Sequence, residues 1–99
     1  MIRATLQMKV KPGKGAEFER AWEKIADKVR QAPGNIRQAL LKDPQAADSY
    51  VLTSDWQSPE QFHAFEKSPE QDDLTAPLRE LRASASMAVH QLIKHVEGA

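Results

Sequence analysis

The first strand of this chain is visible in the alternation of apolar and polar side chains near its N-terminus. Every second residue from 2 to 10 is apolar, and every residue in between is polar. Successive side chains of a strand point to opposite faces, so the pattern predicts a strand with one face on a core. The segment KPGKG at 11–15 then ends the strand. The apolar positions are Ile2, Ala4, Leu6, Met8 and Val10.

The spacing of apolar residues next changes to that of a helix. Steps of four, three and four residues predict a helix over about 14–31 with one apolar stripe. The segment APGN at 32–35 ends this helix, and three further strands are predicted over 36–42, 49–56 and 86–96. The helical stripe consists of Phe18, Trp22, Ile25 and Val29.

Two copies of the segment SPEQ, ten residues apart, mark the connection between the last two strands. In each copy, a serine caps a helix, a proline takes the first helical position, and a glutamine completes a capping box. Ser58 and Ser68 therefore each predict a new helix, and the two short helices should meet at an angle. We expect a pocket in the gap between them, with Trp56 at its border. Pro77 should kink the second helix or begin a fresh first turn capped by Thr75.

The order of elements, β-α-β-β-α-β, is typical of an α+β ferredoxin-like fold. Residues 1–99 therefore form a single domain, with the helices on one face of a four-stranded antiparallel sheet. In the last two predicted strands, apolar residues occur at both even and odd positions, so apolar side chains point to both faces of the sheet. This predicts that both faces are packed against other parts of the protein. We infer a homodimer whose sheets pack face to face. The pairs of opposite parity are Tyr50 and Val51, Leu52 and Thr53, Val89 and Leu92, and Ile93 and Val96.

Composition narrows the possible partners. Fourteen basic and fourteen acidic residues cancel, so nothing favours a nucleic acid or an anionic membrane surface. Cysteine is absent, and no apolar run reaches the roughly 20 residues of a membrane helix. We expect a cytoplasmic protein without a bound metal, because no ligand spacing for one is present.

The stretch APGNIRQALLKDPQAADSYVLTSDWQSPEQFHAFEKSP resembles the antibiotic biosynthesis monooxygenase family. It has a Pro-Gly after the first helix, a tyrosine early and a tryptophan late in one strand, and a Ser-Pro restart of the following helix. The resemblance is strongest to small oxygenases of aromatic polyketide pathways. It implies a ferredoxin-like dimer that forms an α/β barrel, with a pocket in each subunit between sheet and helices. It further implies oxidation of a phenol or anthrone to a quinone by O2, without a cofactor.

The resemblance also implies roles for individual residues. Trp56 matches the pocket tryptophan of the family, and its indole N–H is expected to donate to a substrate carbonyl or peroxide. Tyr50, Leu52 and Ser54 share its strand face and should line the same pocket. Leu52 stands where some members have an asparagine, and Phe62 stands where others have a tyrosine. Both positions have therefore lost a polar group.

Proton transfer requires a base near neutral pH, and histidine is the natural candidate. We expect His90 to be buried among apolar neighbours and to act as the base, whereas His63 and His95 are expected at the surface. Arg37 is a candidate to stabilise a phenolate, as are Arg79 and Arg82. The remaining substrate contacts are expected from Phe65 and Leu78.

Two other functions remain open. A non-catalytic protein that binds a ligand would keep the pocket without the lost polar groups. A polyketide cyclase on the same fold would need a base and an oxyanion site but would not consume O2.

Overall fold

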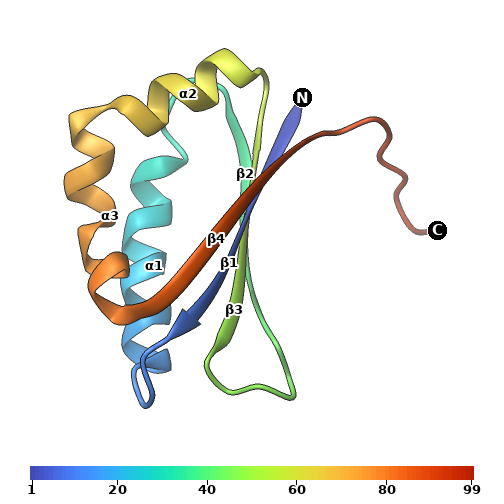
Figure 1. Cartoon of the computed structure of the whole chain (residues 1–99). Helices are drawn as coiled ribbons and strands as arrows, with labels where there is room; N and C mark the ends of the chain where they lie inside the picture. Colours follow the sequence, from blue (N-terminus) through green and yellow to red (C-terminus); the bar gives the residue numbers. More distant parts are fainter.

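The computed structural model describes all 99 residues and has the predicted order of elements (Figure 1). The first helix and the first three strands agree with their predicted bounds to within two residues. The crossover to the last strand contains two helices. The elements are β1 (Ile2–Val10), α1 (Gly15–Val29), β2 (Asn35–Lys42), β3 (Ser49–Trp56), α2 (Pro59–Lys67), α3 (Pro69–Leu81) and β4 (Arg82–Gln91).

The four strands form one antiparallel sheet in the order β2-β3-β1-β4, and the helices lie on one of its faces (Figure 1). This confirms the ferredoxin-like fold. The alternation of β1 is also confirmed, because its apolar residues face the helices. All of them except the half-buried Leu6 join residues of α1, α2, α3 and β3 in a core of 11 buried side chains, among them Phe18 and Trp56.

The crossover begins and restarts at the two predicted caps. The hydroxyl oxygen of Ser58 accepts a hydrogen bond from the backbone N–H of Gln61, and Ser68 accepts one from Gln71, both at 3.2 Å. Figure 1 shows α2 lying across the end of the sheet and α3 turning away from it beside α1. The predicted angle between the two helices is therefore confirmed.

Of the two alternatives predicted for Pro77, a kink or a fresh first turn, the fresh turn is wrong. Helix α3 continues through Pro77 from residue 69 to residue 81. Thr75 does not act as a cap, because its hydroxyl donates to the carbonyl oxygen of Gln71, one turn earlier in the same helix, at 2.9 Å.

The last strand lies four to five residues earlier than predicted. Its partner β1 begins at Ile2, which pairs with Gln91, so no residue of β1 is left to pair with the chain beyond that point. One further backbone bond joins Leu92 N–H to the carbonyl of Met1. Ile93 and Val96, predicted to belong to the strand, instead lie in the C-terminal segment and are exposed. The two-sided apolar pattern therefore holds for β3 but not for β4.

The face of the sheet without helices carries a buried carboxylate that the sequence did not reveal. Asp55 is 1 % exposed and receives two hydrogen bonds from Arg3, at 2.7 and 3.0 Å. Arg37 lies 3.5 Å from the same carboxylate. The register places these residues in one row across the sheet, with His90 beside Arg3 on β4. The hydrogen bonds from Arg3 are the main cause that lowers the pKa of Asp55, against the opposing effect of its burial.

We predict that Ser58→Ala and Ser68→Ala each lower the free energy of unfolding by about 1 kcal/mol, because each removes one cap of a helix. Urea midpoints measure the effect, and Ser84→Ala on the exposed part of β4 is the control. Unchanged midpoints for both cap variants would contradict the capping role.

We predict that Asp55→Asn lowers the free energy of unfolding by about 2 kcal/mol at pH 7, because it removes charged hydrogen bonds from a buried site. The folded-state pKa of Asp55 is lowered, so its stabilisation is present above the ordinary carboxylate pKa of about 4 and is lost as the pH falls below it. The difference between wild type and variant should therefore shrink in acid. The exposed Asp73→Asn is the control, and a difference that stays constant down to pH 3 would contradict the role of Asp55.

Candidate functional site

The helix-side face of β3 holds four of the predicted site residues. Tyr50, Leu52, Ser54 and Trp56 lie opposite the apolar residues of β1 in the register, so they share one face as predicted. Leu52 is half-buried and the other three are buried. The face is about 20 Å long for a strand of this length, so its two ends have different surroundings.

At one end of this face, Trp56 belongs to an aromatic cluster. Its ring centroid lies 5.7 Å from that of Phe62 and 5.1 Å from that of Phe65. Its indole N–H donates to the hydroxyl oxygen of Ser54 at 3.0 Å. The donor that was expected to reach a substrate is therefore already paired within the chain, and Trp56 is only 1 % exposed.

At the other end of the face, Tyr50 makes a separate contact with α1. Its hydroxyl donates to a carboxylate oxygen of Glu19 at 2.6 Å, and its ring packs against Phe18. Burial, followed by the bond to Glu19, raises the pKa of Tyr50 to about 12, so the phenol stays protonated. Tyr50 thus fixes α1 to β3 and is not brought together with Trp56.

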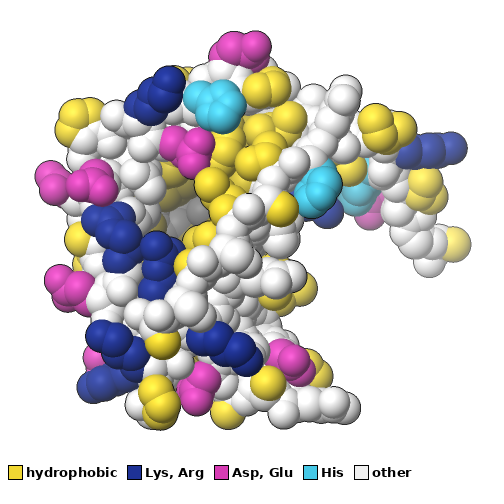
Figure 2. Space-filling model, viewed as in Figure 1, with side chains coloured by type: hydrophobic (Ala, Val, Ile, Leu, Met, Phe, Trp, Pro, Cys, Tyr) yellow, Lys and Arg dark blue, Asp and Glu magenta, His cyan; other side chains and the backbone are white.

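The helices leave the helix-side face of β4 uncovered. Met87 and Val89 point to this side because they pair with Leu6 and Ala4 of β1, yet they are 51 % and 44 % exposed. Figure 2 shows the surface hollowed between α3 and β4, with hydrophobic side chains gathered beneath α2. We call this recess, between β4 at Met87 and Val89 and the helices α2 and α3, the β4 cleft. Phe62 of α2 and Leu78 of α3 belong to the buried core on this same side of the sheet.

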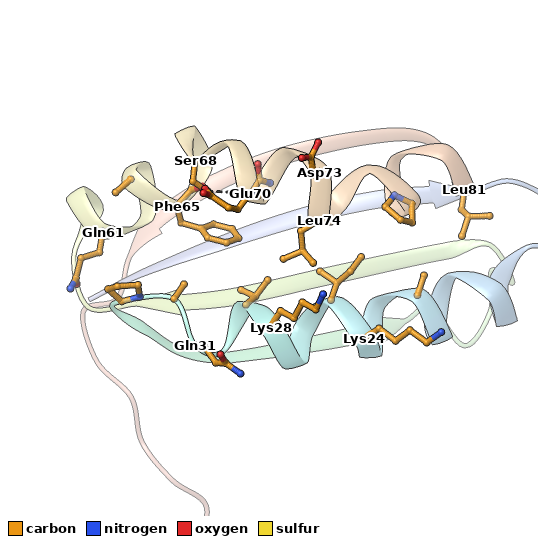
Figure 3. Close-up of a pocket in the computed structure, with 18 of the residues that line it drawn as sticks. Lys24, Lys28, Gln31, Gln61, Phe65, Ser68, Glu70, Asp73, Leu74 and Leu81 are labelled. Carbon is orange, nitrogen blue, oxygen red and sulfur yellow. Dashed lines mark hydrogen bonds between the residues drawn. The ribbon is translucent and has the colours of Figure 1, made fainter.

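A second recess, of about 1220 Å³, runs between α1 and the pair α2 and α3 (Figure 3). We call it the α1–α3 groove. It includes Ser68 at the joint of α2 and α3, so a recess exists where the joint predicted one, but Trp56 is not in its wall. Of the predicted site residues only Phe65 lines it, and 8 of its 20 lining residues are hydrophobic. Figure 3 shows Lys24 and Lys28 along one side of the groove and Glu70 and Asp73 along the other.

His90 was expected to be buried, and this is wrong: it is exposed. It pairs with Arg3 in the register and therefore lies on the face of the sheet opposite to Trp56. Arg37 lies on that same opposite face, beside Asp55. One pocket within a single chain cannot contain both Trp56 and either of these residues. The sequence shows which residues share a side of the strand with His90. It does not show which face of the sheet that side is, because this depends on the pairing between strands.

The structure draws attention instead to His63 on α2. Its imidazole Nδ1 lies 3.3 Å from a carboxylate oxygen of Glu66, and its ring lies 5.7 Å from that of Phe62. Figure 2 shows a histidine over α2 beside the hydrophobic patch of the β4 cleft. The sequence spacing of three residues on a helix already allowed the contact between His63 and Glu66. The ring contact with Phe62 is likewise local, because the two residues are neighbours in the chain; only the position of the histidine beside the hydrophobic patch follows from the structure.

The structure contains no group of three or more His, Cys, Asp or Glu side chains that could hold a metal ion. None of its helices is long and apolar enough to cross a membrane.

Comparison with solved structures supports the fold. The chain is similar to SnoaB, a cofactor-independent oxygenase from Streptomyces nogalater, with a TM-score of 0.87 and 22% sequence identity over 98% of this chain and 97% of SnoaB. A likeness at this identity concerns the fold.

Two curated relatives are longer proteins. Protein SchA of Streptomyces halstedii is 30% identical over 77 residues, which are 78% of this chain and 20% of SchA. A 42.8 kDa protein in the whiE locus of Streptomyces coelicolor is 28% identical over 97 residues, which are 98% of this chain and 24% of that protein. The chain therefore spans about a quarter or less of the length of these relatives.

Comparison with protein families gives the most direct assignment. Residues 1–76, most of the chain from β1 into α3, match the family described as antibiotic biosynthesis monooxygenase. The matched part contains the aromatic cluster of Trp56 and the histidine of α2. The chain belongs to the antibiotic biosynthesis monooxygenase family.

Proposed function

We propose that this chain is a monooxygenase that oxidises a phenolic or anthrone-type aromatic polyketide to a quinone with O2, without metal or flavin. The observation that carries the proposal is an apolar cleft, between sheet and helices, in a chain of the monooxygenase family. The likeness in fold to SnoaB, itself described as a cofactor-independent oxygenase, supports it.

In this reaction the substrate supplies all the electrons. An anthrone first loses a proton, and the resulting carbanion passes one electron to O2. The two radicals combine to a peroxide, which loses water, so that a CH2 group becomes a C=O group. One oxygen atom of O2 enters the quinone and the other leaves as water. The protein must take up the first proton, hold the reactants together and exclude bulk water.

The β4 cleft is suited to hold a flat aromatic substrate. Met87 and Val89 offer it an exposed apolar wall on β4, and the half-buried Leu6 and Leu52 lie on the same face of the adjoining strands. Trp56 lies behind this site, and we assign it a positioning role: it fixes the rings of Phe62 and Phe65 through direct packing.

His63 is the proposed base. Protonated Nδ1 donates to Glu66, which leaves Nε2 with a free lone pair to accept the proton of the substrate. The carboxylate also stabilises the imidazolium that forms. His63 is exposed at the mouth of the cleft, so it can pass the proton on to solvent.

We also propose that two copies associate through the faces of the sheets that lack helices. Leu41 is 50 % exposed on this face, and Val51 lies beside it across the pair of β2 and β3. In such a dimer, Arg37 and His90 would lie near the interface instead of in the substrate site.

One observation favours non-catalytic binding of a ligand as the second candidate. By the resemblance, some family members have polar side chains at the positions of Leu52 and Phe62, which this chain lacks, and the N–H of Trp56 is paired with Ser54. A binding protein would take up the same aromatic molecules and leave them unchanged.

We predict that the purified chain consumes one O2 per quinone formed from dithranol, a trihydroxyanthracene that tautomerises to an anthrone. Trp56→Phe should lower kcat about tenfold or more while KM changes little, because the aromatic cluster behind the cleft packs less tightly and the substrate is misplaced. An O2 electrode and quinone absorbance measure both quantities.

The control for this variant is Phe18→Leu, a core substitution at the far end of the sheet, which should lower stability and leave kcat unchanged. Dithranol binding without O2 uptake above the rate in buffer would establish the binding protein and reject the oxygenase.

We predict that His63→Gln lowers kcat about 100-fold and removes the limb of the pH profile that belongs to the base, because a positioned base typically contributes this much. His95→Gln in the C-terminal segment is the control and should leave both unchanged. A loss of activity in His90→Gln but not in His63→Gln would contradict this assignment and return the role to the opposite face of the sheet.

We predict a dimer in solution, because the exposed Leu41 and the neighbouring Val51 would otherwise stay partly in water. Light scattering should give twice the chain mass of 11.1 kDa at micromolar concentration. Leu41→Lys should shift the protein towards monomer, whereas Leu74→Lys, on the helix layer, should not. A monomeric wild type would reject the association.

A further inference from the structure

Only two of the lysine and arginine side chains in this chain are withdrawn from the surface, and all the others are exposed. One of the two is Arg3, which donates two hydrogen bonds to the carboxylate of Asp55. The other is Arg82, the first residue of β4, which is half-buried and makes no hydrogen bond or ion pair. A charge that has lost part of its hydration is normally paired. Arg82 therefore lacks the kind of partner that Arg3 has.

The surroundings of Arg82 offer no anion in place of this partner. The one charged group that acts on it is Arg79, which has the same sign. Burial, followed by the charge of Arg79, lowers the pKa of Arg82, although an arginine stays protonated at neutral pH. Arg79 is itself engaged, because it donates to the hydroxyl of Thr75 at 2.6 Å and lies 3.3 Å from the carboxylate of Asp72. The nearest acid on this face of α3 is therefore already used.

The end of helix α3 explains a cation at this position only in part. Arg82 is the C-cap residue of α3, and the carbonyl end of a helix favours a positive charge. This effect does not require a hydrogen bond, and Arg82 makes none with the carbonyl groups of the helix. The N–H groups of its guanidinium thus have no acceptor within the chain and are free to bind a ligand.

Arg82 lies at the end of the β4 cleft where α3 passes into β4. It pairs with Val10, which is buried on the helix-facing side of β1. Leu81 lines the α1–α3 groove, whereas Arg79 and Arg82 do not, so the two arginines belong to the other side of α3. Figure 2 shows basic side chains at the lower edge of the hollow, opposite the hydrophobic patch beneath α2. The cleft therefore has an apolar region at one end and an unpaired guanidinium at the other.

We propose that Arg82 binds a carboxylate group of the aromatic substrate, so that the β4 cleft selects aromatic acids over neutral ring systems; this rests on the proposed function of the cleft. The planar guanidinium donates parallel N–H bonds that match the two oxygens of a carboxylate. Arg82 and Met87 are about 17 Å apart along the strand, a distance that an arginine side chain and three fused rings together can span. The ring farthest from the carboxylate then lies beneath α2, on the side of His63.

The experiment compares the affinities of two non-reactive ligands, anthraquinone-2-carboxylate and anthraquinone-2-carboxamide, by equilibrium dialysis at constant ionic strength. The two have the same ring system and nearly the same size, and they differ in charge. The wild type should bind the carboxylate at least about tenfold more tightly than the carboxamide. Arg82→Gln should bind both alike, through a loss of affinity for the carboxylate alone. Arg82→Lys should keep part of the preference, because it keeps the charge without the planar fork.

The matched control is Arg20→Gln, which removes the same charge from the wall of the α1–α3 groove and should bind both ligands like the wild type. The urea midpoint of Arg82→Gln should not fall, because the side chain makes no bond within the chain. Equal affinities in the wild type, or the same loss in Arg20→Gln, would overturn the proposal. A lower urea midpoint with an unchanged preference for the carboxylate would also overturn it and leave Arg82 as a helix cap.

This measurement needs no turnover, so its outcome is separable from that of the oxygenation assay. Oxidation of dithranol together with equal affinities for acid and amide would reject the carboxylate site and leave the oxygenase in place. A preference for the acid that depends on Arg82, without O2 uptake, would support the carboxylate site in a protein that binds aromatic acids and leaves them unchanged.

Discussion

The register between β1 and β3 decides on which face of the sheet each residue of these two strands lies. Ile2 pairs with Trp56 and Arg3 pairs with Asp55, so two neighbouring residues of β3 have opposite surroundings. Trp56 lies in the aromatic core beneath α2, and Asp55 lies between two arginines on the other face; each is 1 % exposed. A slip of one residue would place a carboxylate in the core and an indole among guanidinium groups. Both errors are costly, so the two residues together fix the register.

The same register separates the proposed substrate site from the proposed interface between two copies. Residues that face the helices form the core and, where α2 and α3 do not reach β4, an open apolar cleft. Residues that face the other way carry the row of Arg37, Asp55, Arg3 and His90, beside exposed aliphatic groups. We therefore assign the substrate to the first side and a second copy of the chain to the other. A histidine on α2, rather than one on β4, is then the group that can meet the substrate.

Local signals in the sequence were sufficient for most of the fold. The alternation in β1 and the two serine caps depend on neighbours within a few residues, and they predicted their elements well. The end of β4 was misjudged because it depends on the register between β4 and β1, which no local pattern shows. His90 was misplaced for the same reason. The local alternation shows which residues point the same way as His90, but the pairing across the sheet decides which face of the sheet they are on.

The site was less predictable than the fold. The shared face of Leu52, Ser54 and Trp56 followed from alternation, whereas the hydrogen bond from Trp56 to Ser54 depends on a side-chain rotamer. Asp55 looked like one more surface charge, because its partners Arg3 and Arg37 are 52 and 18 positions away in the chain.

The most direct test of the division between the two faces is methyl NMR of the chain, labelled at Leu, Val and Met, with a non-reactive dihydroxyanthraquinone. We expect the methyl signals of Met87, Val89 and Leu6 to shift on binding, because these side chains border the β4 cleft or adjoin it. The signals of Leu41 and Val51, on the other face, should not change. Shifts confined to Leu41 and Val51, or to Leu74 and Leu81 in the α1–α3 groove, would contradict the assignment of the substrate to the β4 cleft.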